Sequence, residues 1–513
     1  MPIAHCDASG GPQLPVVGKS GNEHFDVIIM GAGLSGIGAA YRLQTRCPGR
    51  SYAVFEARPQ IGGTWDLFRY PGIRSDSDMF TLGYPFRPWK EAKAIADGPS
   101  ILNYIRETAH DYGIDRHIRF DHRVTAANWS PDDSLWHITV ESNGAALNYT
   151  CNFLYGCTGY YRYDEGYQPK FPGVADYRGQ FVHPQHWPEA LDYAGKRVVV
   201  IGSGATAVTL VPAMSHTAGH VTMLQRSPTY IMTLPAHDPI ADVVRRVLPD
   251  RAAHGVLRWK NILLSLGVFE LSRFAPELTK RVIRRGAEKN LPPGYDLDTH
   301  FKPRYQPWDQ RLCLVPDSDL FHAISSGRAS IATGEIDTFT STGIRLKSGE
   351  ELPADIVVSA TGLQMLALGG VHLSVNGALV DPGHSFVYKG VMLSNVPNFA
   401  FCVGYTNASW TLRADLSSTF VCRVLEHMQR HQYHTVVPAC DIARLDPKPL
   451  LDFNSGYVLR AIADLPKQAS KAPWFIRQNY IRDAITMKLS KVDDGVLRFA
   501  DKYRNREAAL SSH

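Results

Sequence analysis

The stretch FDVIIMGAGLSGIGAA, residues 25–40, decides the fold, because three glycines at fixed spacing follow directly on a run of apolar residues. Residues 25–30 have the continuous apolar pattern of a buried strand, and residues 37–47 are expected to form a helix. Between them Gly31, Gly33 and Gly36 form the pattern G-x-G-x-x-G. Glycines there allow a tight turn and let the backbone approach a pyrophosphate, which lies against the positive N-terminus of the helix.

A second apolar strand, expected at residues 51–57, completes a strand–helix–strand unit. Glu56 stands at its end, about 20 residues after the glycines, where a carboxylate accepts hydrogen bonds from the hydroxyls of an adenosine ribose. We therefore expect a dinucleotide with an unmodified ribose at this first turn.

The same succession returns at residues 196–225, with Gly202, Gly204 and Ala207 in the turn. Here the second strand ends in Arg226, followed by Ser227, where the first unit has a carboxylate. A guanidinium binds a 2′-phosphate that a carboxylate would repel, so NADPH is expected at the second turn. One site of each type indicates that FAD is held permanently and that a nicotinamide reduces it.

These two units predict an α/β fold with two Rossmann-like dinucleotide-binding domains, one for FAD and one for NADPH, and a helical insertion. Residues 1–24 are rich in Gly, Pro and Ser and are expected to form a flexible extension.

Two short apolar strands that end in Thr-Gly mark the crossings between the domains, and the second of them makes Thr361 and Gly362 further candidates for cofactor binding. The NADPH domain is expected at residues 166–360. The FAD domain is then discontinuous, with a first part at 25–165 and a second part, including the C-terminal region, at 361–513.

The helical insertion, expected at about 238–300, contains a basic segment. Residues 238–289 hold 11 Lys or Arg against six Asp or Glu, in a chain whose net charge is +5. Basic amphipathic helices bind membrane surfaces or anions, but charged helical faces are more often simply exposed to water. We expect a solvated face here.

Composition limits the partners of the protein. A net charge of +5 over 513 residues is mild, so no nucleic-acid partner is expected. The eight cysteines form no C-x-x-C pair, which indicates free thiols in a reducing compartment and neither a disulfide framework nor a metal site. Because the sequence shows neither a signal peptide nor an apolar run long enough to span a bilayer, a cytoplasmic protein is expected.

Two longer motifs carry a resemblance to a known family. Residues 62–76, GGTWDLFRYPGIRSD, match every fixed position of a signature of type I Baeyer–Villiger monooxygenases, [AG]-G-x-W-x4-[FY]-P-[GM]-x3-D. Residues 177–188 resemble the second signature of that family, F-x-G-x3-H-x3-W-P, with Tyr177 in place of the phenylalanine. Residues 307–316 and 403–416 resemble the subgroup that contains the ethionamide-activating monooxygenase.

The resemblance implies an FAD- and NADPH-dependent enzyme that uses O2 to convert ketones to esters or lactones through a C4a-peroxyflavin. Oxygenation of sulfides or thioamides at sulfur would be a secondary activity. Arg311 is expected to stabilise the peroxide anion, since a guanidinium stays charged and offers no acidic proton. Asp76 would orient that arginine and, with Gly63, Thr64 and Trp65, would contact the cofactor. Without the resemblance, Asp76 would be taken as a helix N-cap.

The second signature lies between the two nucleotide units and fits neither an amphipathic helix nor an alternating strand. We expect an interdomain linker in which His183 and Trp187 dock on both domains and couple their rotation to a change in the position of NADP⁺. His183 is expected to act through conformation and not as a proton-transfer catalyst, with a core histidine as the alternative. His186 is expected at the surface.

Three other functions compete with this one, and each is distinguished by a feature of the sequence. An N- or S-oxygenating flavin monooxygenase acts through the hydroperoxyflavin and does not need Arg311. A pyridine nucleotide disulfide reductase shares both turns but needs a dithiol beside the flavin, and the sequence has no C-x-x-C or C-x4-C pair. A flavin-bound interaction protein would not need both signatures. Gln310 stands where many members of the family have a lysine for the 2′-phosphate, so the preference for NADPH is expected to depend mainly on Arg226.

Overall fold

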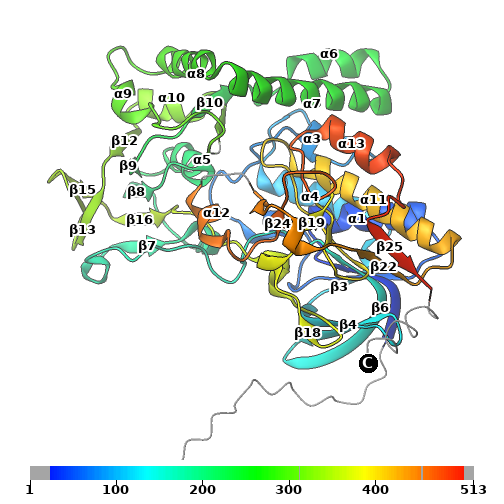
Figure 1. Cartoon of the computed structure of the whole chain (residues 1–513). Helices are drawn as coiled ribbons and strands as arrows, with labels where there is room; N and C mark the ends of the chain where they lie inside the picture. Colours follow the sequence, from blue (N-terminus) through cyan, green and yellow to red (C-terminus); the bar gives the residue numbers. More distant parts are fainter. Residues whose placement is uncertain (1–22, 311, 452–454, 502–513) are drawn as a thin grey trace, which may run out of the picture.

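The computed structural model describes residues 23–310, 312–451 and 455–501 (Figure 1). The N-terminal extension expected at 1–24 therefore lies outside the described residues, except for its last two. Those two belong to the first strand, which begins at Glu23 and not at Phe25 as expected.

The first sheet is built around β1 (Glu23–Met30), which lies parallel between β2 (Tyr52–Phe55) and β6 (Ala145–Gly156). Buried Val, Ile and Met side chains at the end of β1 explain its apolar run. The sheet extends antiparallel beyond β6, and β21 (Phe399–Phe401) also pairs with β6. Its main path has the order β18 (Ala378–Leu379), β17 (His372–Val375), β4 (Arg123–Ser130), β5 (Leu135–Ser142), β6, β1, β2 and β3 (Ile118–Arg119).

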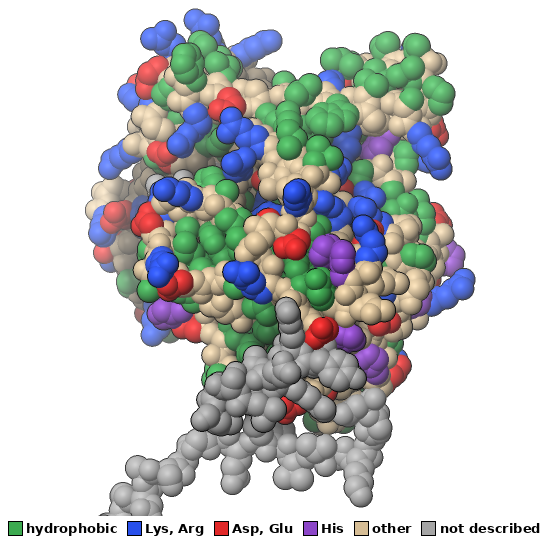
Figure 2. Space-filling model, turned by 45° about the vertical axis from the view of Figure 1, so that its right-hand side comes forward, with side chains coloured by type: hydrophobic (Ala, Val, Ile, Leu, Met, Phe, Trp, Pro, Cys, Tyr) green, Lys and Arg blue, Asp and Glu red, His purple; other side chains and the backbone are tan. Residues whose placement is uncertain are grey.

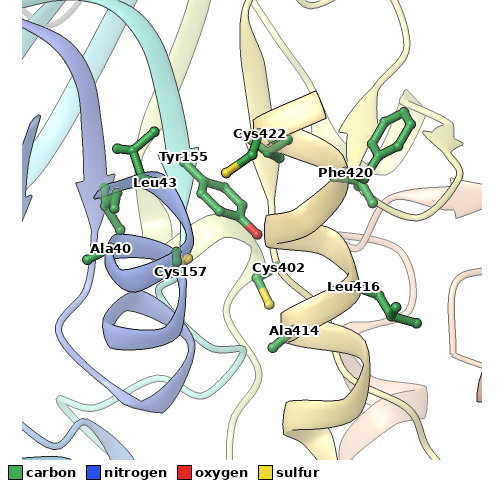
Figure 3. Close-up of a cluster of buried hydrophobic side chains, with 14 of the residues drawn as sticks. Ala40, Leu43, Tyr155, Cys157, Cys402, Ala414, Leu416, Phe420 and Cys422 are labelled. Atoms are coloured by element: carbon green, nitrogen blue, oxygen red, sulfur yellow. The ribbon is translucent and has the colours of Figure 1, made fainter. Parts of the chain in front are cut away.

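Two long helices cover one face of this sheet. Helix α1 (Leu34–Arg46) packs against α11 (Trp410–Arg430), and Figure 3 shows Tyr155 of β6 between them. The Tyr155 hydroxyl lies 3.1 Å from Ser418 Oγ, which satisfies both buried groups. Cys402 and Cys422 lie in the same layer, and all the described cysteines are free thiols, as the sequence indicates.

The second sheet is entirely parallel and has the doubly wound order of a Rossmann domain (Figure 1, left). Its strands follow the order β12 (Ala329–Thr333), β9 (His220–Gln225), β8 (Arg197–Ile201), β16 (Ile356–Ser359) and β7 (Gln180–Val182). Helix α5 (Ala205–Met214) follows β8 and packs beside α10 (Asp319–Ser325). The chain thus leaves the first sheet after β6, builds the second, and returns with β17.

Strand β7 corrects one expectation. Residues Gln180–Val182 pair in parallel with β16, so this part of the second signature is an edge strand of the second sheet and not an irregular linker. A short 3-10 helix, Pro184–His186, follows it. Three residues are too few for alternating burial to appear in the sequence, which is why the strand was not expected.

The helical insertion is present as α6 (Pro239–Val247), α7 (Asp250–Phe274), α8 (Pro276–Asn290) and α9 (Leu297–His300). It lies along the top of the molecule in Figure 1. Helix α7 is tied to α3 (Met79–Leu82) of the first domain by buried Arg258, whose Nη1 donates to the carbonyls of Phe80 and Gly83, each at 2.8 Å. Lys260 forms an ion pair with Asp238, which caps α6.

The remaining elements complete the two domains and their C-terminal cover. No helix in the described ranges is long and apolar enough to cross a membrane. The described residues hold no cluster of His, Cys, Asp and Glu that could bind a metal ion. The other main elements are α2 (Thr64–Leu67), α4 (Gly98–Asp111), β10 (Ile231–Leu234), β11 (Cys313–Pro316), β13 (Ile336–Thr340), β14 (Gly343–Leu346), β15 (Glu351–Pro353), β22 (Thr435–Pro438), α12 (Gly456–Ala461), α13 (Tyr480–Leu489) and β25 (Leu497–Ala500).

Candidate active site

A single cavity of about 460 Å³ is lined by residues of both glycine turns. Gly31, Gly33 and Glu56 line it from the first domain, and Ala205 and Thr206, at the start of α5, line it from the second. The two units that the sequence places about 170 residues apart therefore share one space, with the first signature between them.

The first turn has the geometry that a phosphate requires. Gly31 adopts a φ of +100°, and a Cβ on it would lie 2.7 Å from the carbonyl oxygen of Cys157. A Cβ on Gly36 would lie 1.8 Å from the carbonyl oxygen of Gly31. Helix α1 begins after Gly33 with no side-chain cap, so its first N–H groups are available to an anion in the cavity.

Glu56 is buried at the end of β2, with 5% of its surface exposed. Its two oxygens accept hydrogen bonds from the backbone N–H of Ala32, at 2.7 Å, and of Arg58, at 3.0 Å. Burial raises the pKa of this carboxyl group, and the two N–H donors oppose that shift. Each oxygen keeps a second lone pair, so the carboxylate can still accept from a ribose hydroxyl.

The first signature begins in the wall of the cavity. Gly63, with a φ of +56°, precedes α2, and Gly63, Thr64 and Trp65 all line the cavity. Asp66, 2% exposed, holds this turn in place, because its Oδ2 lies 2.7 Å from Nη2 of Arg58. Sequence reasoning missed this pair, since a carboxylate in a short motif carries no sign of the arginine that it will meet.

The signature then crosses to the second domain. Gly72, with a φ of +76°, packs against α5 so closely that a Cβ on it would lie 2.6 Å from the Cβ of Ala213. Arg74 forms an ion pair with Asp319 at the start of α10. The motif therefore fastens the first dinucleotide turn to the second domain, and Gly72 leaves the space that this close packing against α5 needs.

Asp76 and Asp78 have different structural roles. The N-cap of α3 is Asp78, whose Oδ1 accepts a hydrogen bond from the backbone N–H of Thr81 at 3.0 Å. Asp76 lines the cavity. The capping role that the sequence offers as the alternative for Asp76 thus belongs to its neighbour, and the predicted role of Asp76 beside an arginine stays a prediction.

The second turn repeats the first in outline. Gly202 has a φ of +135°, and a Cβ on it would lie 2.4 Å from the carbonyl oxygen of Ala360. Gly204 precedes α5, which also starts without a side-chain cap, and Ala207 is buried in the helix. At the end of β9, Arg226 and Ser227 are exposed and therefore accessible to a ligand.

The second signature is held against both domains. The Nε2 of Gln185, 2% exposed, donates to the carbonyls of Arg162 and Tyr163, both at 2.9 Å. Tyr163 lines the cavity, and its hydroxyl lies 3.4 Å from Thr64 Oγ1. Sequence reasoning did not single out Gln185, because a glutamine outside the fixed positions has no distinguishing pattern.

His183 and Trp187 are half-buried, and His186 is exposed, as expected. The Nδ1 of His183 accepts a hydrogen bond from the backbone N–H of Gln185 at 3.2 Å, and burial lowers the pKa of the imidazole. A neutral ring at physiological pH is consistent with a positioning role. Trp187 packs against the core of the second domain.

Eight of the predicted cofactor residues do not line the cavity, namely Gly36, Gly202, Gly204, Ala207, Arg226, Ser227, Thr361 and Gly362. Thr361 Oγ1 donates to the carbonyl of Tyr167 at 2.9 Å, and the backbone N–H of Tyr167 donates to the carbonyl of Gly362 at 3.2 Å. Thr361 and Gly362 follow β16, and their hydrogen bonds therefore hold the end of this strand against the segment that leads into the second signature. Their predicted contact with a cofactor remains a prediction.

Arg311 lies outside the described residues. The segment before it contains Trp308, which has a φ of +72° and contacts Phe269 of α7 with a ring separation of 5.6 Å. Shortly after it, Leu314 lines the cavity. The predicted contact of Arg311 with Asp76 stays a prediction.

Comparison with known proteins identifies the family. A family model of flavin-binding monooxygenase-like proteins matches residues 83–242, and one of NAD(P)-binding Rossmann-like domains matches residues 29–97. The FAD-containing monooxygenase EthA of Mycolicibacterium smegmatis is 54% identical over 491 residues, which cover 96% of this chain and 100% of that protein. The chain belongs to the flavin-binding monooxygenase family. A probable FAD-binding monooxygenase, AlmA of Acinetobacter baylyi, is 48% identical over 483 residues, 94% of this chain and 97% of that one.

Solved structures confirm the predicted fold class. A steroid monooxygenase bound to NADP has a TM-score of 0.75 and 20% identity, over 93% of this chain and 100% of that one. An open form of cyclohexanone monooxygenase has a TM-score of 0.75 and 18% identity, over 94% of this chain and 100% of that one.

Family membership also confirms that the chain is a flavin monooxygenase. The disulfide-reductase alternative finds no support, because Cys157 is the only described cysteine in the cavity wall and such an enzyme needs two thiols beside its flavin.

Proposed function

We propose that this flavin monooxygenase is a Baeyer–Villiger enzyme that uses FAD, NADPH and O2 to convert ketones to esters or lactones. The observation that supports the proposal is the shared cavity, which is lined by the first glycine turn, by the start of α5 after the second turn, and by the aspartate of the first signature. Two relatives are named as FAD-containing or FAD-binding, and a solved steroid monooxygenase holds NADP, which supports the choice of cofactors.

The residues of the first turn fit FAD. Gly31 and Gly36 leave room that a Cβ would fill, and the uncapped start of α1 supplies N–H donors for the pyrophosphate. Glu56 is placed to accept from the adenosine ribose. Gly63, Thr64 and Trp65 also line the cavity and would contact the same cofactor. Bound, reduced FAD would be the group that reacts with dioxygen.

The second turn fits NADPH. The uncapped start of α5 would hold the pyrophosphate, and the exposed Arg226 would bind the 2′-phosphate, with Ser227 beside it. The cavity wall reaches Ala205 and Thr206, so a nicotinamide bound at this turn has a path to the first domain.

Arg311 and Asp76 would carry the oxygen-transfer step. The guanidinium of Arg311 would stabilise negative charge at the reacting oxygen without offering a proton, and Asp76 would fix its orientation by accepting a bidentate pair of hydrogen bonds. His183 and Gln185 would position the loops around them, because Gln185 binds the segment that carries Tyr163. In this proposal His183 is a positioning residue.

The proposal is tested with a panel of linear, cyclic and aryl ketones and, in parallel, of sulfides. NADPH consumption stimulated by a ketone, with one ester formed for each NADPH consumed, is the expected result. Oxygenation of sulfides and amines with no ester from any ketone would show instead an N- or S-oxygenating flavin monooxygenase.

A further inference from the structure

The helical insertion exposes an unusual amount of apolar surface. Of the 17 large hydrophobic side chains exposed among the described residues, 11 lie between residues 240 and 282, with exposures from 48% to 91%. We call these 11 the apolar face; they are Ile240, Val243, Val247, Val256, Trp259, Leu263, Leu264, Leu271, Phe274, Leu278 and Val282.

The apolar face follows helical periodicity and is not a set of scattered side chains. On α7, Val256, Trp259, Leu263 and Phe274 repeat at intervals of three, four and eleven residues, which places them on one side of the helix. Similar spacing relates the exposed residues of α6 and those of α8. The opposite side of α7 is buried against the rest of the protein, so this helix is apolar on its outer side as well.

Basic side chains border the apolar face. Six cations on the three helices are exposed and form no ion pair with any residue that the structure describes. Figure 2 shows hydrophobic side chains along the upper edge of the molecule, where the insertion lies, with Lys and Arg beside them. The six cations are Arg246, Arg251, Arg273, Arg281, Arg285 and Lys289.

We propose that α6, α7 and α8 form a docking surface for a lipid bilayer that contains anionic headgroups. Helices that lie in a membrane interface combine an exposed apolar side, including Trp and Phe, with Lys and Arg that meet the phosphates. A second copy of this chain is a poorer occupant, because a two-fold contact would bring the same cations together. The sequence alone favoured a solvated face, since it shows the charges but not that the apolar side chains point outward.

Helix α7 of the docking surface contacts the segment that leads to Arg311. Phe269 of α7 contacts Trp308, in the segment that leads to Arg311. The described helices cannot cross a membrane, so the protein would lie on the bilayer and not in it. Apolar ketones that partition into lipid would then be concentrated beside the segment that carries Arg311.

Flotation of the holoenzyme with vesicles tests this proposal. Wild-type protein is expected to float with vesicles of phosphatidylcholine and phosphatidylglycerol, less with pure phosphatidylcholine, and less again at high salt. Leu263→Ser combined with Phe274→Ser should lower the partition coefficient by roughly tenfold or more. Arg281→Glu combined with Arg285→Glu should abolish the preference for the anionic lipid.

Matched controls lie on other surfaces. Leu379→Ser removes an equally exposed apolar side chain, 77% exposed on β18, and Lys170→Glu reverses an exposed charge in the second domain. Both should bind vesicles like wild type, and ketone-independent NADPH oxidation without vesicles should stay normal in every variant. The proposal would be overturned if the wild-type protein did not bind anionic vesicles. A dimer that Leu263→Ser with Phe274→Ser dissociates, while neither form binds lipid, would overturn it as well.

Discussion

The imidazole of His183 lies directly against the backbone of Gly166, where a Cβ would come within 1.9 Å of its Cε1. The second signature thus packs on the segment that enters the second domain, and only a residue without a side chain leaves room for the ring. Gly166 does not adopt a positive φ, so the requirement is for space and not for backbone freedom.

Gly166→Ala should therefore reproduce the defect of His183→Ala. Both variants should keep FAD and fold normally, but turn over roughly ten to a hundred times more slowly, because the loops around the site lose their position. FAD absorbance and steady-state NADPH oxidation measure the two effects. Gly255→Ala is the control, since a Cβ there meets nothing within 4 Å. If His183→Ala lost its FAD, His183 would have a structural role and not a positioning one.

The sequence predicts the glycine turns better than the contacts that hold the site in place. Gly31, Gly33 and Glu56 could be placed from sequence because a turn, a helix start and a strand end are local features. Asp66 and Gln185 could not, because their partners are backbone groups and arginines brought close only by tertiary packing. The same limit explains why Asp76 and Asp78 could not be told apart by capping chemistry alone.

Asp76 and Asp78 should give opposite phenotypes. Asp78→Ala removes the cap of α3 and should lower the free energy of unfolding by about 1 kcal/mol. Asp76→Asn should leave the unfolding curve unchanged and reduce ester formation, if the carboxylate orients Arg311. Urea denaturation and product analysis on both variants separate the two roles. A stability loss for Asp76→Asn with normal ester formation would contradict the assignment.

Arg226→Ala should raise the Michaelis constant for NADPH much more than that for NADH. The loss of a charged hydrogen bond to the 2′-phosphate corresponds to roughly 1.5–3 kcal/mol, or about ten- to a hundredfold. Gln310→Lys should act in the other direction and sharpen the preference for NADPH. Steady-state kinetics with both nucleotides check this prediction. Equal changes in the Michaelis constants for NADPH and NADH would contradict the role assigned to Arg226.

His254 should make the protein less stable in mild acid. Burial, together with nearby Arg258, lowers the pKa of this histidine to about 4, from an ordinary value of 6.5. Between these values the unfolded chain binds a proton that the folded protein does not, so the free energy of unfolding falls as the pH falls. The loss attributable to His254 at about pH 5 is roughly 2 kcal/mol. Urea unfolding at about pH 7 and about pH 5 should show a smaller decrease for His254→Gln than for wild type.

Arg311→Ala is the most direct test of the proposed reaction. The variant should bind FAD and still accept hydride from NADPH, because the groups proposed to bind the two cofactors belong to the two glycine turns and the strand ends that follow them. Without the guanidinium, negative charge at the reacting oxygen loses its partner, and ester formation should fall by roughly a hundredfold or more, with the reducing equivalents released as hydrogen peroxide. Arg311→Lys keeps a charge but not the planar fork and should recover only part of the rate. Combined with Asp76→Asn, the loss should be smaller than the product of the two separate factors, because the residues act as one unit. Product analysis with a peroxide assay decides the matter: ester at the normal rate from Arg311→Ala would mean that another group holds the charge.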